Sequence, residues 1–157
     1  MNGSEGISRV VVGVDGSPAS YEALRWAVRH ARFVGATVDA VAAYDVPAAD
    51  GWSAPTVDTG FDEERARQDL TAEIGTVLLQ VGEVPLVQHV VRGNAADVLT
   101  KASVGAEVLV VGSRGRGGFA SLLLGSVSQQ CALYAPCPVV IVRQGTVDDA
   151  TAAAEAS

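Results

Sequence analysis

Residues 106–126, AEVLVVGSRGRGGFASLLLGS, pass from an apolar run directly into a segment rich in glycine and arginine. The aliphatic run predicts a fully buried β-strand over 106–113. The segment Gly112 to Ser126 holds five glycines and two arginines, which predicts a loop. Residues 126–129 fit the S-x-x-Q capping box, so we expect a helix with Ser126 as its N-cap. A buried strand, a glycine-rich loop and a helix are therefore expected in succession.

The same alternation of strand and helix extends from this stretch in both directions. Ser17 followed by Pro18 predicts the start of the first helix, and Gly35 predicts its end. Asn94 is the expected N-cap of a short helix that reaches about Val104. We expect strands at 8–14, 36–45, 85–93, 106–113 and 137–143, and helices at 18–34, 62–82, 95–104 and from 126.

Strands that alternate with helices indicate the α/β class. The order predicts a single doubly wound domain: a five-stranded parallel sheet with helices on both faces. We place this domain at 8–143, between a flexible N-terminus at 1–7 and a mobile acidic tail at 144–157. Residues 45–61 have no clear periodicity and predict a long loop, a kind of segment that often forms a lid or a binding surface.

Composition excludes several classes of protein. The chain has 157 residues, a formal net charge of −7 and eleven basic residues, which argues against a nucleic-acid-binding surface. No apolar run is long enough to span a membrane and no basic leader precedes the first strand, so we expect a cytoplasmic protein. Cys131 and Cys137 are spaced C-x5-C, which matches no common zinc or redox motif.

The glycine-rich loop has the chemistry of an anion site. It is expected between the carboxyl end of a parallel strand and a helix N-terminus, where ligands bind in open α/β sheets. Glycine lets backbone N–H groups approach an oxyanion closely, and Arg114 and Arg116 add charged donors. The alternative is a flexible turn without a ligand. A Walker A motif is excluded because the only lysine, Lys101, lies outside the loop.

Asp15 is expected at the same edge of the sheet, at the end of the first strand. A carboxylate there would repel a triphosphate, but it suits a ribose hydroxyl or an adenine amino group. The alternative is a structural role, in which Asp15 accepts hydrogen bonds from the backbone of the turn that enters the first helix.

Taken together, these residues resemble the universal stress protein family, in particular its ATP-binding branch. The nucleotide signature of that branch, G-x2-G-x9-G-[ST], is found at Gly112, Gly115, Gly125 and Ser126. The segments VVVGVDGSPAS, VRGNAADVL and APCPVVIVR are similar to other parts of the family pattern, and the resemblance covers about residues 8–143. It implies the strand order 3-2-1-4-5, which opens a crevice between the ends of strands 1 and 4.

The resemblance also implies a set of nucleotide contacts. Asp15 would contact ribose or adenine, and Ala43 would offer its backbone to adenine. The implied contacts to the base, the ribose and the phosphates come from Gly13, Val14, Asp15, Ala43, Gly93, Gly112, Arg114, Gly115, Gly125, Ser126 and Val127.

The implied function is that of an ATP-binding stress-response regulator or sensor, with Mg²⁺ or Mn²⁺ accompanying the phosphates and at most slow hydrolysis, because no catalytic residue is assignable. Two alternatives remain: an adenylate-forming or hydrolytic enzyme that acts on adenine nucleotides, and a regulator that binds cAMP. Residues 138–143 would form an edge strand with four β-branched residues in a row, so we also expect a homodimer paired through this strand.

Overall fold

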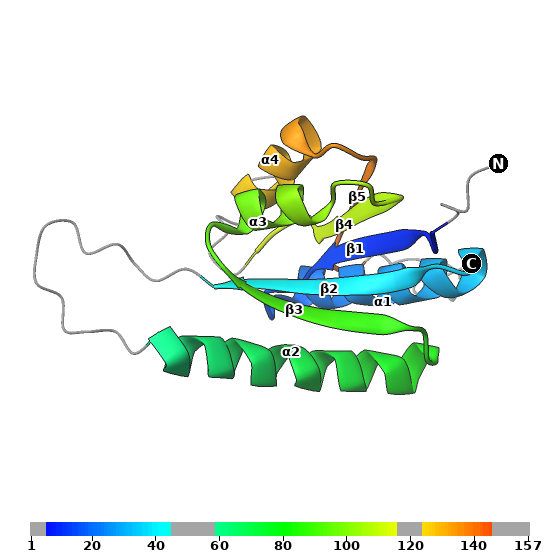
Figure 1. The fold of residues 1–157 in the computed structure, drawn as a ribbon, viewed down its shortest axis with the longest axis horizontal. Coiled ribbons are helices and arrows are strands. Elements are labelled where there is room, and N and C mark those ends of the chain that lie inside the picture. Colours follow the sequence, from blue (N-terminus) through cyan, green and yellow to red (C-terminus); the bar gives the residue numbers. More distant parts are fainter. Residues whose placement is uncertain (1–5, 45–58, 116–123, 146–157) are drawn as a thin grey trace, which may run out of the picture.

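Strands and helices alternate along the chain as the sequence predicts (Figure 1). The computed structural model describes residues 6–44, 59–115 and 124–145. Within these ranges the strands are β1 (Arg9–Gly13), β2 (Thr37–Tyr44), β3 (Leu86–Arg92), β4 (Val108–Gly112) and β5 (Val139–Val142). The helices are α1 (Pro18–Val34), α2 (Thr59–Val81), α3 (Ala95–Ala102) and α4 (Ser126–Tyr134).

The five strands form one parallel sheet in the order β3-β2-β1-β4-β5, which confirms the expected order. β1 is the central strand, and its residue Val11 pairs with Asp39 of β2 and with Leu109 of β4. The strand order reverses between β1 and β4, so the crevice typical of doubly wound sheets lies between the ends of these two strands.

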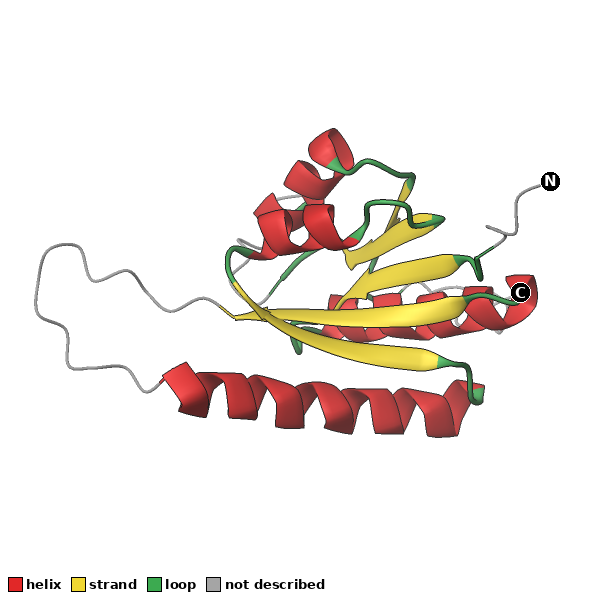
Figure 2. Ribbon diagram, viewed as in Figure 1, coloured by secondary structure: helices red, strands yellow, loops and turns green. Residues whose placement is uncertain are grey.

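Helices cover both faces of the sheet, as expected (Figure 2). Alternate residues of a strand point to opposite faces, so β1 contributes to two cores. Val10 and Val12 pack in the core beneath α1 and α2, whereas Val11 packs in the smaller core beneath α3 and α4. No helix in the described ranges is long and apolar enough to cross a membrane.

Capping residues begin and end two helices as predicted. Ser17 is the N-cap of α1, and its hydroxyl accepts a hydrogen bond from the Ser20 amide. Gly35, in the left-handed conformation at φ 73°, ends the same helix. Asn94 is the N-cap of α3, and its side chain accepts from the amides of Ala96 and Asp97.

Two helix boundaries differ from the expectation by two residues or more. Helix α2 begins at Thr59, three residues before the expected start, so residues 59–61 belong to the helix and not to the predicted loop. Helix α3 ends at Ala102, two residues before Val104. The remainder of the loop, the first residues of the chain and nearly all of the tail lie outside the described residues.

Candidate functional site

Eight of the eleven residues implied by the family resemblance line one cleft at the carboxyl edge of the sheet. The cleft lies at the switch point, where the ends of β1 and β4 meet the first turns of α1 and α4. Its walls also include residues of α3. These eight residues are Gly13, Val14, Asp15, Ala43, Gly112, Arg114, Gly115 and Val127.

Two glycines allow close approaches around the cleft. A Cβ atom on Gly115 would lie 2.9 Å from Oδ2 of Asp15, so the start of the glycine-rich loop faces this carboxylate directly. A Cβ atom on Gly112 would lie 2.7 Å from the backbone carbon of Ala19 and 2.8 Å from the Ser20 nitrogen. The first turn of α1 therefore rests on the end of β4, and Gly112 has a packing role whatever binds beside it.

Asp15 has the structural role that the sequence left open as an alternative. Its Oδ1 atom accepts a hydrogen bond of 2.9 Å from the Ser17 amide, and its own amide donates to the Ser20 hydroxyl at 3.2 Å. The side chain is nevertheless exposed, and Oδ2 is the oxygen beside Gly115. One carboxylate oxygen thus supports the turn into α1 while the other faces the loop.

The prediction that Ser126 caps α4 is wrong. Gly125 is the N-cap, with extended backbone at φ −72° and ψ 167°, and it forms no side-chain capping bond. The Gln129 amide donates to the Gly125 carbonyl oxygen at 3.0 Å, so the helix begins at Ser126, one residue earlier than the capping box requires. Because the capping residue has no side chain, the first amides of α4 are left to other acceptors, which favours an anion at this helix end.

Serine hydroxyls hold the start of the loop in place, a role that sequence reasoning did not assign to Ser17 or Ser128. The buried Ser128 hydroxyl lies 3.1 Å from the Ser113 carbonyl oxygen and 2.9 Å from that of Gly125. The Ser17 hydroxyl donates to the Arg114 carbonyl oxygen at 3.3 Å. The S-x-S spacing at 126–128 was the available signal, since a serine one turn into a helix can reach back to the preceding carbonyls.

Three of the implied residues do not line the cleft. Gly125 and Ser126 lie at the start of α4, where the next residue, Val127, lines the cleft. Gly93 ends β3 with φ at 146°, and it lines a separate groove on the other side of α3. Arg116 lies outside the described residues, so Arg114 is the arginine that the structure places in the cleft.

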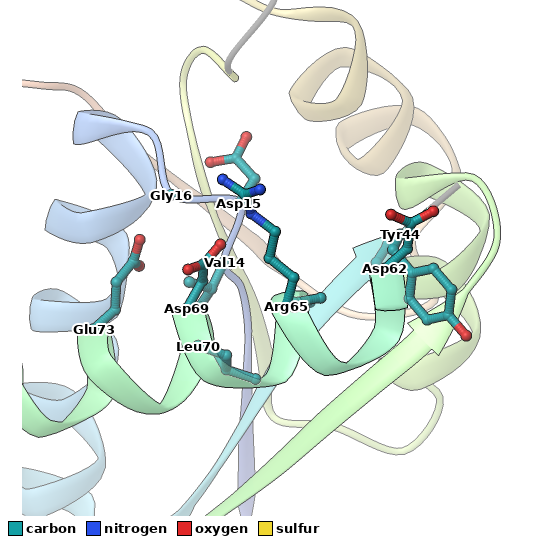
Figure 3. A pocket seen from close by; sticks show the side chains of 12 residues that line it. Val14, Asp15, Gly16, Tyr44, Asp62, Arg65, Asp69, Leu70 and Glu73 are labelled. Carbon is teal, nitrogen blue, oxygen red and sulfur yellow. The ribbon is translucent and has the colours of Figure 1, made fainter. Parts of the chain in front are cut away.

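A second hollow adjoins the cleft and shares Val14, Asp15 and Ala43 with it. Its volume is about 380 Å³, whereas the cleft encloses about 60 Å³ between the described residues. Figure 3 shows the second hollow, into which α2 directs three acidic side chains and one basic side chain. These α2 side chains are Asp62, Asp69, Glu73 and Arg65. The acidic lining repels phosphate, which leaves the glycine-rich side as the electrostatically favoured place for an anion.

Metal ligands and histidines are not concentrated at this edge. Within the described ranges, no group of three or more His, Cys, Asp and Glu side chains is placed to hold a metal ion. His30 stacks on Trp26 within α1, with ring centroids 4.8 Å apart. His89 lies on β3, where its Nε2 atom is 3.4 Å from Oδ1 of Asp39. Neither histidine lines the cleft.

The sequence profile of the universal stress protein family matches residues 6–143. This chain belongs to the universal stress protein family. Universal stress protein Rv2623 of Mycobacterium tuberculosis is 36% identical over 135 residues, which are 86% of this chain and 45% of that protein. Universal stress protein Rv2005c of the same organism is 35% identical over 136 residues, again 86% of this chain and 45% of the relative. The chain therefore spans about half the length of these relatives.

Solved universal stress proteins share the fold. The protein UspA from Lactobacillus plantarum superposes with a TM-score of 0.74 at 20% identity, covering 87% of this chain and 97% of that one. A universal stress protein solved in complex with cAMP has a TM-score of 0.58 at 27% identity, covering 89% of this chain and 99% of that one.

Proposed function

We propose that this universal stress protein binds ATP in the cleft between β1 and β4 and acts as a nucleotide-dependent regulator or sensor. The observation that carries the proposal is the convergence of eight implied contact residues, from four separate segments of the chain, on one cleft at the switch point of the sheet. The nucleoside would lie against Gly13, Val14 and Ala43, and Oδ2 of Asp15 is the free acceptor for a hydroxyl or amino group.

The phosphates would lie on the glycine-rich side. Arg114, the Gly115 backbone and the first turn of α4 supply donors there, and the α4 N-cap offers no side chain that competes for its amides. This donor set fits an oxyanion. Mg²⁺ or Mn²⁺ would then be held mainly by the phosphate oxygens, because the described protein residues form no metal-ligand cluster.

A solved relative supports a nucleotide as the class of ligand, whereas the donors in the cleft bear on which nucleotide binds. The 27% identical structure holds cAMP, which makes an adenine nucleotide the class of ligand to test first. The Mycobacterium tuberculosis relatives are about twice as long as this chain.

We also infer that hydrolysis is slow at most. Both histidines lie away from the cleft, and Asp15 already accepts one backbone hydrogen bond. Donors that hold the phosphates equally well before and during phosphoryl transfer give binding without acceleration.

The direct experiment is to denature the purified protein and identify the released small molecules by mass spectrometry. Calorimetry with ATP, for the wild type and Gly115→Glu, then tests the cleft. We expect Gly115→Glu to abolish binding, because its carboxylate would enter the phosphate side next to Asp15. Gly75→Glu on α2 is the matched control, since a Cβ there has nothing within 4 Å. An unchanged ATP affinity in folded Gly115→Glu would remove the cleft from the proposal.

Asp15→Ala separates the nucleoside from the phosphates. We expect ATP affinity to fall about tenfold to a hundredfold, the usual effect of losing a hydrogen bond to a charged group. Inorganic triphosphate should bind almost as before, because the predicted contact is to ribose or adenine. Because Asp15 also bonds the Ser17 amide, the folded fraction must be measured alongside. An equal loss for both ligands would indicate that Asp15 acts only through the turn.

The cAMP alternative is favoured by the solved neighbour and has its own test. Competition between ATP and cAMP, at equal concentrations and followed by calorimetry, compares the two ligands directly. The donors on the loop and α4 predict the tighter binding of ATP, because a cyclic monophosphate reaches fewer of them. Tighter cAMP binding would replace ATP as the proposed ligand and leave the cleft in place.

The homodimer through Pro138 to Arg143 remains part of the proposal. β5 is an edge strand of the sheet, and all four of its residues are half-buried. The carbonyl groups of Pro138 and Val142 accept hydrogen bonds from the β4 side, at Leu109 and Ser113. Since main-chain groups alternate in direction along a strand, those of Val139 and Ile141 point outward, where a second copy could pair.

This alternation gives a matched pair of variants. Ile141→Pro removes an outward N–H and should give monomers with the sheet retained. Val140→Pro faces β4 and should disrupt the sheet itself. Light scattering should find twice the chain mass of 16.1 kDa for the wild type. A wild-type mass equal to that of one chain would contradict the dimer.

A further inference from the structure

A groove separate from the nucleotide cleft lies on the face of β2 and β3 that α3 covers only in part. Its volume is about 540 Å³, within the range of small-molecule sites. Figure 1 shows α2 running along the whole of β3, whereas α3 is short and lies nearer the carboxyl end of that strand. Val87 and Val91 of β3 consequently remain 48% and 39% exposed.

The floor of the groove is partly apolar and partly an ion pair. Val41, Val91, Val98 and Ala102 supply the apolar surface. Asp39, buried on the neighbouring strand, is 2.6 Å from Nη1 of Arg9 and 3.4 Å from Nε2 of His89. The other Arg9 nitrogen donates to the Val104 carbonyl oxygen at 2.7 Å. The Asp39 charge is thus balanced within the protein, and Arg9 is committed to holding it.

Two cations at the groove have no such partner. Arg92 is the last residue of β3 and pairs with Tyr44 of β2, and Lys101 lies in the last turn of α3. Neither side chain has an ion pair among the described residues. Asp97 also lines the groove, one helical turn before Lys101, but the two side chains form no ion pair. Three of the chain's eleven basic residues, Lys101 among them as its only lysine, line this one groove of an acidic protein.

We propose that this groove binds a small amphipathic carboxylate, with its apolar body on Val91 and Val98 and its carboxylate between Arg92 and Lys101. Apolar walls with a few convergent charged groups are the usual composition of a small-molecule site. Arg92 and Lys101 are exposed and hydrated in the free groove, and a carboxylate offers them charge-assisted hydrogen bonds that a neutral ligand does not. The groove is separate from the nucleotide cleft, although Val41 and α3 border both.

The probes are 2-naphthoate and its neutral counterpart 2-naphthamide, titrated into the isotopically labelled full chain and followed by NMR. We expect 2-naphthoate to shift the amides of β3 and α3, including those of Val91, Lys101 and Ala102. The amide probe should bind at least tenfold more weakly. Equal affinities for the two probes would overturn the proposal, because the cations would then contribute nothing.

Arg92→Gln and Lys101→Gln test the two cations separately. Each should weaken 2-naphthoate about tenfold or more and leave 2-naphthamide unchanged. Arg29→Gln removes the same charge from an exposed position on α1, which packs on the other face of the sheet from the groove. It should leave the affinities for both probes unchanged. If all three variants weaken 2-naphthoate equally, the effect is one of net charge and the groove is not the site.

Failure here is distinguishable from failure of the proposed nucleotide site. The 2-naphthoate titration is repeated with excess ATP present, and again with the Gly115→Glu variant. In both experiments 2-naphthoate should still shift the amides of β3 and α3. If the probe instead shifts Gly13 and Gly115 and is displaced by ATP, it binds in the nucleotide cleft and the proposed groove is wrong.

Discussion

The two faces of the sheet differ in how completely helices cover them. On one face, α1 and α2 have 17 and 23 residues and bury a continuous core. On the other, α3 and α4 have only 8 and 9 residues, and the core beneath them is smaller. The covered face supplies most of the buried apolar surface and hence most of the stability, while the shorter helices leave room for ligands.

The difference in helix coverage between the two faces can be seen at two neighbouring residues of β2. On β2, Val38 is fully buried beneath α1 and α2, whereas the next residue, Asp39, faces the α3 side. Val38 pairs with Leu86 of β3, and Asp39 pairs with Val87. One step along these paired strands therefore moves from a closed core to an open groove, which lets substitutions of similar chemistry test the two faces separately.

The largest expected effect comes from the covered face. Leu70→Ala on α2 removes a fully buried side chain from the larger core and should cost about 2–5 kcal/mol of unfolding free energy. Leu79→Ala on the same helix is the control, because Leu79 is 90% exposed, and should change stability by less than about 0.5 kcal/mol. Urea unfolding of both variants measures the difference. Similar losses would mean that another surface covers Leu79.

The smaller core beneath α3 and α4 can be tested by raising the pH. Burial raises the pKa of the Cys131 thiol to about 11, with a further contribution from nearby Cys137. The folded protein thus keeps a proton that the unfolded chain loses above its ordinary pKa of about 9. Stability should be complete below pH 9 and fall by about 2–3 kcal/mol as the pH rises to 11.

Cys131→Ala provides the comparison for this pH dependence. The variant should lose the component of alkaline destabilisation that belongs to this thiol. Urea unfolding at several pH values between 8 and 11 measures the difference. Identical slopes for the wild type and the variant would show that the Cys131 thiol is hydrated in the folded state.

The sequence predicts the scaffold well because strand order and capping follow from short patterns. The β-branched runs locate all five strands, and Ser17, Gly35 and Asn94 bound helices where expected. The cleft could also be predicted from the sequence, because the signature glycines lie at strand and helix ends. The start of α4 could not be predicted. Gly125 and Ser126 can both precede a helix, and tertiary contacts with Ser113 decide between them.

The groove could not be predicted from sequence for a different reason. Its existence depends on how far α3 extends over β3, which is a matter of helix length and placement. Asp39 lies within the apolar strand segment ATVDAVAAYD, but its partners Arg9 and His89 come from two other strands. The pattern of apolar and polar residues within one strand does not predict which residues of other strands will contact it across a parallel sheet.

A medium effect is expected at the ion pair beneath the groove. Asp39→Asn keeps the size of the side chain and removes the charge that Arg9 and His89 face. We expect a loss of about 1–2 kcal/mol, less than for a fully buried pair, because the Arg9 side chain is 36% exposed and remains partly hydrated. Thermal and urea unfolding measure the change. A gain in stability would mean that the desolvation of Asp39 destabilises the fold by more than its interactions with Arg9 and His89 stabilise it.

The smallest effect is expected where the open face is most exposed. Val87→Thr preserves a β-branched shape on β3 and places a hydroxyl where water already reaches, so stability should change by less than about 0.5 kcal/mol. Val38→Thr, on the neighbouring strand and the other face, places the same hydroxyl in a closed core and should cost about 1–3 kcal/mol. Urea unfolding of both variants compares the faces with the chemistry held constant. If Val87→Thr costs as much as Val38→Thr, β3 is covered in solution by another surface, and the groove beside it is closed.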